Sequence, residues 1–186
     1  MKRLFDVFFS SFLLVIILPF MVLIALSVKC SSKGSVLYWS RRVGKNNHIF
    51  LMPKFRTMIE NSPDVATHLL DNPEIYITKI GRYLRKTSLD ETPQIFSIIK
   101  GDMSLVGPRP ALFNQDDLIK LRTKSNIHKL SPGLTGLAQI NGRDELSIRE
   151  KIDFDEIYLK KQSILFDLRI LILTILKIIL RDKVSH

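Results

Sequence analysis

A long uncharged segment near the amino terminus limits what this chain can fold into. From Val7 to Val28 the sequence contains no charged residue and consists mostly of Phe, Leu, Ile and Val. About 20 apolar residues are enough for a helix that crosses the hydrocarbon core of a bilayer. Because 46% of the whole chain is hydrophobic, the segment favours a membrane-associated protein over a freely soluble one.

Pro19 divides this segment, and a proline removes a backbone hydrogen bond from a helix interior. If the helix breaks there, each half is too short to cross a core of about 30 Å at 1.5 Å per residue. Basic residues flank both ends, with Lys2 and Arg3 before the segment and Lys29 and Lys33 after it, and such residues favour the cytoplasm. These features are compatible with a re-entrant hairpin and with a kinked helix that spans the membrane. A cleaved signal peptide is disfavoured because the apolar run is long.

The net charge of the chain is +10 at pH 7, and nearly all of it lies beyond the apolar segment. Such an excess predicts an anionic partner, which could be a lipid headgroup, a nucleotide or a nucleic acid. The single cysteine, Cys30, excludes an intramolecular disulfide and indicates a reducing compartment. The four histidines show no metal-ligand spacing, and the sequence contains no Walker A loop, dinucleotide fingerprint or zinc ligand set.

Two adjacent carboxylates, Asp90 and Glu91, precede an apolar run that predicts a helix ending at Gly101. The helix is expected to start between Asp90 and Pro93, because proline is tolerated in a first turn; a capping box of Ser88 with Glu91 is the alternative start. A helix N-terminus stabilises carboxylates, so Asp90 is expected to stay ionised. It could attack phosphorus while Glu91 binds a hard cation such as Mg²⁺. Ordinary helix capping explains the same two acids without any chemistry.

Basic residues and tight turns elsewhere are suited to phosphate. In Gly107-Pro108-Arg109-Pro110 two prolines stiffen the chain around an arginine, whose planar fork matches phosphate oxygens. Lys54 and Arg56 lie on one side of a predicted extended segment. Pro132, Gly133 and Gly136 predict tight turns, and Asn141-Gly142-Arg143 predicts a turn that presents an arginine. Solvated strands and simple loop closure are the alternatives.

The pattern of the remaining chain predicts a helix-rich α/β domain. Strands are expected at 35–39 and 48–52 around a turn at 44–47, and a basic amphipathic helix leads into Ser88. A charged helix is expected at 144–161. The tail at 166–181 is too often interrupted by charge to span a bilayer, so it predicts an amphipathic helix in the membrane interface, with a core helix as the alternative.

Four motifs, in this order along the chain, resemble the signature of the monotopic phosphoglycosyl transferases, the bacterial sugar transferase family. They are Lys54-Phe55-Arg56-Thr57-Met58, Ser88-Leu89-Asp90-Glu91-Thr92-Pro93-Gln94, the run from Lys100 to Pro110, and the run from Pro132 to Arg143. The resemblance covers nearly the whole chain. It implies that residues 1–30 form a re-entrant membrane helix broken near Pro19, and that residues 31–186 form a cytoplasm-facing catalytic domain with an interfacial C-terminal helix, on the bacterial inner membrane.

The resemblance also implies an activity, the transfer of a sugar-1-phosphate from a UDP-sugar to polyprenol (undecaprenyl) phosphate with release of UMP. This would be the first membrane step of glycoconjugate synthesis, and it would require Mg²⁺. Asp90 would be the nucleophile that forms an aspartyl-phosphosugar intermediate, and Glu91 the metal ligand. The implied substrate-binding residues are Lys54, Arg56, Arg85, Pro108, Arg109, Pro110, Gln139 and Arg143.

The expected partners are the UDP-sugar, polyprenol phosphate and membrane phospholipids. Downstream glycosyltransferases are further possible partners, and nucleic acid is not an expected one. The sequence departs from the family pattern at Ser40, where Gln is usual, and at Thr92 and Ser97, where Leu and Asn are common.

Two rival functions use the same features. A membrane-anchored binding protein would explain the charge but not the acidic pair, and a phosphatase or hydrolase would use Asp90 with water as the acceptor.

Overall fold

The computed structural model describes residues 1–60, 62, 72–142 and 145–180. Its helices are α1 (Lys2–Ser31), α2 (Lys79–Thr87), α3 (Gln94–Lys100), α4 (Asp116–Lys124), α5 (Leu137–Ile140), α6 (Ile148–Lys161) and α7 (Ile164–Leu180). Its strands are β1 (Leu37–Val43), β2 (Ile49–Phe55), β3 (Ser104–Val106), β4 (Ala111–Leu112) and β5 (Gly133–Thr135). Short 3₁₀ turns are η1 (Lys45–Asn47), η3 (Pro73–Ile75), η4 (Leu89–Glu91) and η5 (Ile127–Lys129). The helix-rich α/β class predicted from the sequence is confirmed.

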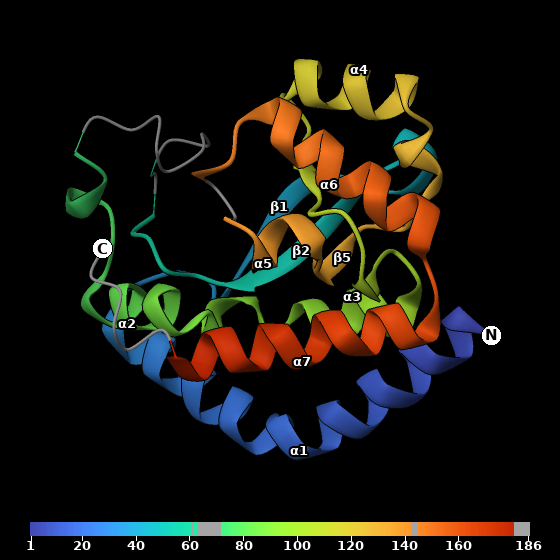
Figure 1. Cartoon of the computed structure of the whole chain (residues 1–186). Helices are drawn as coiled ribbons and strands as arrows, with labels where there is room; N and C mark the ends of the chain where they lie inside the picture. Colours follow the sequence, from blue (N-terminus) through green and yellow to red (C-terminus); the bar gives the residue numbers. More distant parts are fainter. Residues whose placement is uncertain (61, 63–71, 143–144, 181–186) are drawn as a thin grey trace.

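The apolar segment forms the single long helix α1, which continues through Pro19. Figure 1 shows α1 as a bent helix that curves beneath the rest of the molecule. A proline in a helix interior removes one hydrogen bond and bends the axis. Among the described residues, α1 is the one helix long and apolar enough to cross a membrane. Large apolar side chains are exposed along it, including Leu4, Phe8, Phe12, Val15, Phe20, Leu23 and Leu26.

The amino-terminal end of α1 is attached to the α/β domain by buried polar contacts. Asp6 is 2% exposed, and its carboxylate accepts hydrogen bonds from the Ser104 hydroxyl at 2.8 Å and the Leu105 N–H at 3.2 Å. Arg3 donates to the carbonyls of Ile98 and Ile99. These carbonyls lie in the last turn of α3, where they have no partner within the helix.

The other end of α1 contacts the same domain through apolar packing. Val28 is fully buried, and it forms a cluster with Met21, Phe55 from β2 and Leu84 from α2. Both ends of α1 therefore contact the α/β domain, and residues between them, such as Ser10 and Met21, are also buried.

Two small sheets support the loops above α1. Strand β1 pairs antiparallel with β2 in a register that runs from Leu37 opposite Phe55 to Val43 opposite Ile49, and β4 pairs with the other edge of β1. The predicted hairpin is therefore confirmed, with strands that extend further than expected. Strands β3 and β5 form a separate parallel pair, with Ser104 opposite Gly133.

The C-terminal helix α7 starts close to its expected position and lies between α1 and the strands in Figure 1. One of its faces is buried, with Ile170 1% exposed and Asp167 0% exposed. The other face exposes apolar side chains, namely Leu165, Ile172, Ile175, Leu176, Ile178 and Leu180. The helix is therefore amphipathic, and Lys177 donates to the Ile140 carbonyl.

A buried polar network joins α1, α6, α7 and β3. The Tyr158 hydroxyl is 2.9 Å from the Val106 carbonyl and 2.7 Å from the Asp167 carboxylate. Lys2 forms an ion pair with the other oxygen of Asp167 at 2.5 Å. A buried polar group that loses its partner costs about 1–3 kcal/mol, so this network stabilises the junction between the four elements.

We therefore expect Tyr158→Phe to lower the free energy of unfolding by about 1–3 kcal/mol, because the buried Asp167 carboxylate and Val106 carbonyl lose a shared donor. Chemical denaturation of the detergent-solubilised protein measures the change. Tyr83→Phe is the matched control, since Tyr83 is 59% exposed. Equal stability of the two variants would contradict a stabilising role for the network.

Candidate active site

The acidic pair lies in a turn between two helices. Helix α2 ends when Ser88 adopts a left-handed conformation with φ of 57°, and η4 then carries Asp90 and Glu91. Helix α3 begins at Gln94 with Pro93 as its N-cap, so the two acids precede the helix instead of occupying its first turn. The predicted helix start was wrong because the proline marks the cap. The alternative capping box was also wrong, since Ser88 makes no side-chain cap hydrogen bond.

Asp90 is a buried carboxylate, 8% exposed. Burial raises the pKa of Asp90 above its ordinary value, and Glu91 beside it also raises the pKa, while the positive charges of Lys54 and Arg85 oppose this shift. The sequence predicted an acid stabilised by a helix N-terminus. The structure shows instead a carboxylate whose burial has the largest effect on its pKa, because η4 is covered by neighbouring segments.

Glu91 joins three segments of the chain. Its Oε1 atom lies 2.7 Å from Lys54 Nζ at the end of β2 and 3.3 Å from Arg109 Nη2 in the turn after β3. Burial lowers the pKa of Lys54, and Glu91 opposes that shift. The structure thus brings together Lys54, Asp90, Glu91 and Arg109, four of the residues that the family resemblance implies for the site.

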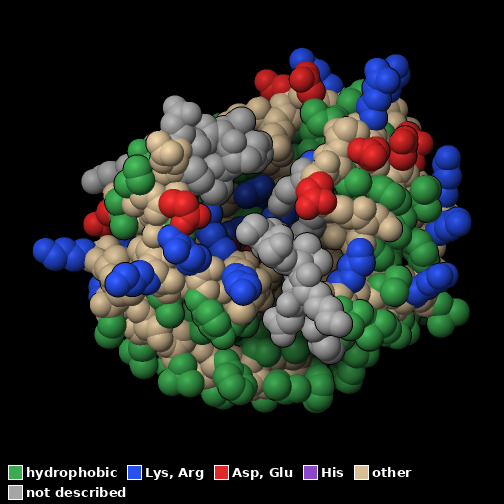
Figure 2. Space-filling view, turned by 60° about the vertical axis from the view of Figure 1, so that its left-hand side comes forward, with side chains coloured by type: hydrophobic (Ala, Val, Ile, Leu, Met, Phe, Trp, Pro, Cys, Tyr) green, Lys and Arg blue, Asp and Glu red, His purple; other side chains and the backbone are tan. Residues whose placement is uncertain are grey.

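Arg85 lies close to this group and donates from Nε to the Thr57 hydroxyl at 2.8 Å. The charge of Arg85 opposes the rise in the pKa of Asp90, so Arg85 lies within electrostatic reach of that carboxylate. Figure 2 shows a hollow on one face of the molecule with Lys and Arg side chains inside it. The three cations near Asp90 and Glu91 are Lys54, Arg85 and Arg109. They suit an anionic ligand, because they can compensate additional phosphate charge.

Other predicted site residues lie elsewhere. Arg56 is buried and donates from Nη2 to the carbonyl and hydroxyl oxygens of Ser32, the C-cap of α1, both at 3.0 Å. Gln139 lies in α5, and both polar atoms of its amide are buried with no hydrogen-bond partner among the described residues. Arg143 lies outside the described residues.

The glycines of the third and fourth motifs allow two loops to approach closely. A Cβ atom on Gly133 would lie 2.1 Å from the backbone N of Gly107, and one on Gly136 would lie 2.1 Å from the Gly107 carbonyl oxygen. Such distances exclude any side chain. Loop closure, one of the two interpretations of these glycines, therefore accounts for both of them, and their spacing places the turn that carries Arg109 against the loop before α5.

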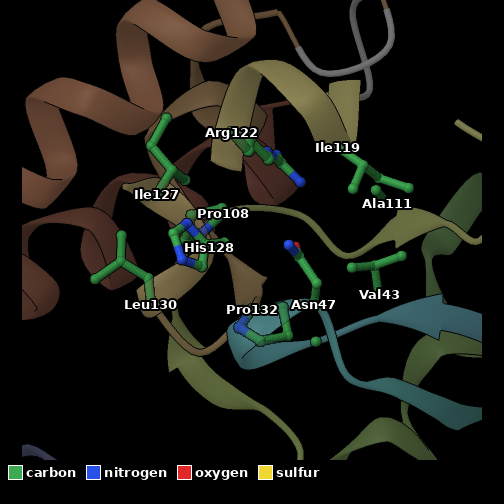
Figure 3. Close-up of a pocket in the computed structure, with 11 residues that line it drawn as sticks. Val43, Asn47, Pro108, Ala111, Ile119, Arg122, Ile127, His128, Leu130 and Pro132 are labelled. Atoms are coloured by element: carbon green, nitrogen blue, oxygen red, sulfur yellow. The ribbon is translucent and has the colours of Figure 1, made fainter. Parts of the chain in front are cut away.

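A small cavity lies beside this turn (Figure 3). Pro108, Arg122 and His128 contribute to its wall, and its volume is about 30 Å³. That space suits one or two water molecules and is far too small for a nucleotide. The sequence did not single out Arg122, because it lies in the polar helix α4 without a recognisable motif.

The acidic pair also has the donor chemistry for Mg²⁺. This ion binds one or two carboxylates and completes its octahedral shell with water and substrate phosphates. Among the described residues no group of three or more His, Cys, Asp or Glu side chains could hold a metal. Two adjacent carboxylates in a cationic site fit an ion that is bound together with a phosphate ligand.

The fold and the site together define a helix-rich α/β protein with an apolar anchor helix and an acidic pair among cations. The chain belongs to the bacterial sugar transferase family, whose model matches residues 1–181.

Several curated relatives support this assignment. A Klebsiella pneumoniae protein named UDP-glucose:undecaprenyl-phosphate glucose-1-phosphate transferase is 40% identical over 183 residues, which cover 95% of this chain and 39% of the relative. The exopolysaccharide production protein ExoY of Rhizobium meliloti is 40% identical over 94% of this chain and 83% of its own length. The undecaprenyl-phosphate galactose phosphotransferase of Salmonella typhimurium is 36% identical over 98% of this chain and 41% of its own. The chain thus spans about two fifths of the first and third relatives.

The raised pKa of Asp90 predicts a pH-dependent cost of folding. The folded state binds the Asp90 proton more tightly than the unfolded state does, so the stabilisation is greatest when Asp90 is protonated and is lost as the pH rises through the raised pKa. Asp90→Asn removes this dependence. We expect the difference in melting temperature, variant minus wild type, to increase between pH 4, which is close to the ordinary aspartate pKa of 3.8, and pH 8.

Thermal unfolding in detergent at both pH values checks this expectation. Asp153→Asn is the control, because Asp153 is an exposed acid on α6 and its replacement leaves Asp90 in place. A difference for Asp90→Asn that stays constant or decreases with pH would show that burial does not dominate the pKa of Asp90.

Proposed function

We propose that this chain transfers a sugar-1-phosphate from a UDP-sugar to a polyprenol phosphate such as undecaprenyl phosphate, and releases UMP. The observation that carries the proposal is the buried Asp90 carboxylate beside Glu91, with Lys54 and Arg109 paired to Glu91. Membership of the bacterial sugar transferase family supports it, as do relatives whose names contain undecaprenyl phosphate and a sugar phosphate.

In the proposed first step, an Asp90 carboxylate oxygen attacks the phosphorus that carries the sugar. A bond forms between that oxygen and phosphorus, and the bond from phosphorus to the bridging oxygen breaks, so UMP leaves with the bonding electron pair. In the second step a phosphate oxygen of the polyprenol phosphate attacks the same phosphorus and releases the Asp90 carboxylate. Two successive displacements allow a nucleotide sugar and a lipid phosphate to use one site in turn.

The residues around Asp90 support this chemistry. Burial makes its carboxylate more basic, which favours nucleophilic attack, while the positive charges of Lys54 and Arg85 oppose protonation. Arg109 and Lys54 would compensate the charge of the diphosphate. Glu91, with Asp90 beside it, would hold Mg²⁺, which supplies charge neutralisation at the diphosphate when bound.

We also propose that α1 enters the membrane and returns to the same side, at the cytoplasmic face of the bacterial inner membrane. The support is that its two ends are both attached to the α/β domain, through Asp6 at one end and Val28 at the other. The exposed apolar face of α7 would then lie in the membrane interface. Membrane phospholipids are the expected partners of both helices.

The two rival functions predict different products. A binding protein would leave the UDP-sugar intact, and its function gives no reason for burying Asp90 at a cost in stability. A hydrolase would release the sugar phosphate into water and would not need a lipid acceptor. Product analysis with and without polyprenol phosphate distinguishes all three functions.

The central experiment omits the lipid acceptor. With a UDP-sugar and Mg²⁺, the protein is expected to release up to one equivalent of UMP and to gain the mass of a sugar phosphate on the peptide that contains Asp90. Asp90→Asn should abolish the adduct and lower turnover by at least about a thousandfold, as expected when a covalent nucleophile is removed. Intact-protein and peptide mass spectrometry measure the adduct.

Glu91→Gln is the companion variant. It keeps the size of the side chain but removes the negative charge, so it should weaken Mg²⁺ dependence and turnover together. Retention of near-normal transfer by Asp90→Asn would overturn the nucleophile assignment, and direct attack by the lipid phosphate would replace it. A panel of UDP-sugars that gives no UMP at all from the wild type would overturn the proposed function.

Cysteine labelling in intact cells tests the topology. In a variant with Cys30→Ser, a cysteine inserted after Met1 and another at Lys33→Cys should both be protected from a membrane-impermeant reagent applied outside the inner membrane. A helix that returns to its starting side keeps both positions in the cytoplasm. Labelling of only one of them would establish a span.

A further inference from the structure

The turn that carries Arg109 has an unusual set of backbone contacts. Two of its residues, Pro108 and Pro110, have no N–H group, so the turn cannot be held by a ladder of backbone donors. Its three carbonyl oxygens are instead bound from outside. Pro108 O accepts from the Gly133 N–H at 2.9 Å, Arg109 O accepts from Arg122 Nη1 at 2.8 Å, and Pro110 O accepts from Arg42 Nη1 at 3.1 Å.

Arg122 is itself held in place by a buried carboxylate. Its Nε and Nη2 atoms lie 2.9 Å and 2.7 Å from Asp155 Oδ2, and the side chains of Arg122 and Asp155 are 11% and 3% exposed. The planar guanidinium therefore presents one edge to Asp155 on α6 and its remaining nitrogen to the turn. Figure 3 shows Arg122 and Pro108 on the wall of the same small cavity.

Stabilisation of the fold alone does not explain the ion pair between Arg122 and Asp155, because burying two charges costs free energy. Burial raises the pKa of Asp155, and the charge and hydrogen bonds of Arg122 oppose that shift. Replacing a buried ion pair with apolar residues of similar volume is often neutral or stabilising. An apolar pair could not, however, hold the carbonyl of Arg109, whose side chain reaches Glu91 at 3.3 Å.

We propose that Arg122, oriented by Asp155, is a positioning residue that holds the Pro108-Arg109-Pro110 turn so that the Arg109 guanidinium points at Glu91 and at the diphosphate of the donor. The inference rests on the proposed function for the identity of that donor. It assigns a role to Asp155, a buried acid on α6. Arg42, oriented by the Ser40 hydroxyl at 3.0 Å, supports the same turn from β1.

The proposal is tested with Arg122→Lys, which keeps the charge but cannot bridge a carboxylate and a carbonyl in one plane. Because small displacements of a positioning group cost up to about a hundredfold, we expect kcat/KM for the UDP-sugar to fall about ten- to a hundredfold. Arg82→Lys is the matched control, since Arg82 forms an exposed ion pair with Glu74 and its replacement should leave kcat/KM unchanged.

A double-mutant cycle with Arg109→Ala separates positioning from general stability. If Arg122 acts through Arg109, the loss caused by Arg122→Lys should shrink to less than about threefold in the Arg109→Ala background. An equal loss in both backgrounds would overturn the proposal. Asp155→Asn is the second variant, and it should give the same background-dependent loss; if Arg122→Lys does not fold, this variant decides.

Hydrogen exchange provides a readout that does not depend on turnover. In Arg122→Lys, the amides of residues 107–112 should exchange faster than in the wild type, while those of α2 are unchanged. Unchanged exchange at 107–112 would overturn the positioning role. Absence of UMP release by the wild type, together with faster exchange in the variant, would instead overturn the proposed function and leave the positioning role of Arg122 supported.

Discussion

The ion pairs of Glu91 with Lys54 and Arg109 hold together three segments that are far apart in the sequence. Lys54 ends β2, Glu91 lies in η4, and Arg109 lies in the turn after β3. Each of these side chains is substantially buried, so each charge needs a partner in place. The position of Asp90 depends on this arrangement, because η4 is fixed on one side by α2 and on the other by the contacts of Glu91.

The same domain also determines the path of α1. Asp6 is bound by the backbone and side chain of β3, and β3 leads directly into the turn that carries Arg109. The other end of α1 packs against Phe55, next to Lys54 on β2. The anchor helix is therefore attached close to two of the segments that form the site. The proposed transfer, which would take one substrate from water and another from the bilayer, would require such a fixed position relative to the membrane.

A conflict between stability and chemistry is visible at Asp90. Burial disfavours its ionised form, and the ionised form is the one that the proposed attack on phosphorus would require. Lys54 and Arg85 reduce the conflict through their charges, but both are themselves buried enough for their pKa values to be lowered. A bound phosphate would favour the charged forms of both side chains, which agrees with the proposed anionic substrate.

The sequence by itself determined the apolar helix, the β1–β2 hairpin, the helix-rich α/β class and the identity of the acidic pair, because these depend on local composition and on motifs that are contiguous in the chain. It also predicted that Lys54 and Arg109 join that pair, through the family resemblance. Three features came only from the tertiary structure. The pKa of Asp90 is raised because distant segments cover it, Arg56 contacts the end of α1, and Arg122 binds the Arg109 carbonyl through an orientation set by Asp155. Burial and ion pairing between residues that are far apart in the chain depend on which elements pack together, and no local pattern of residues encodes that choice.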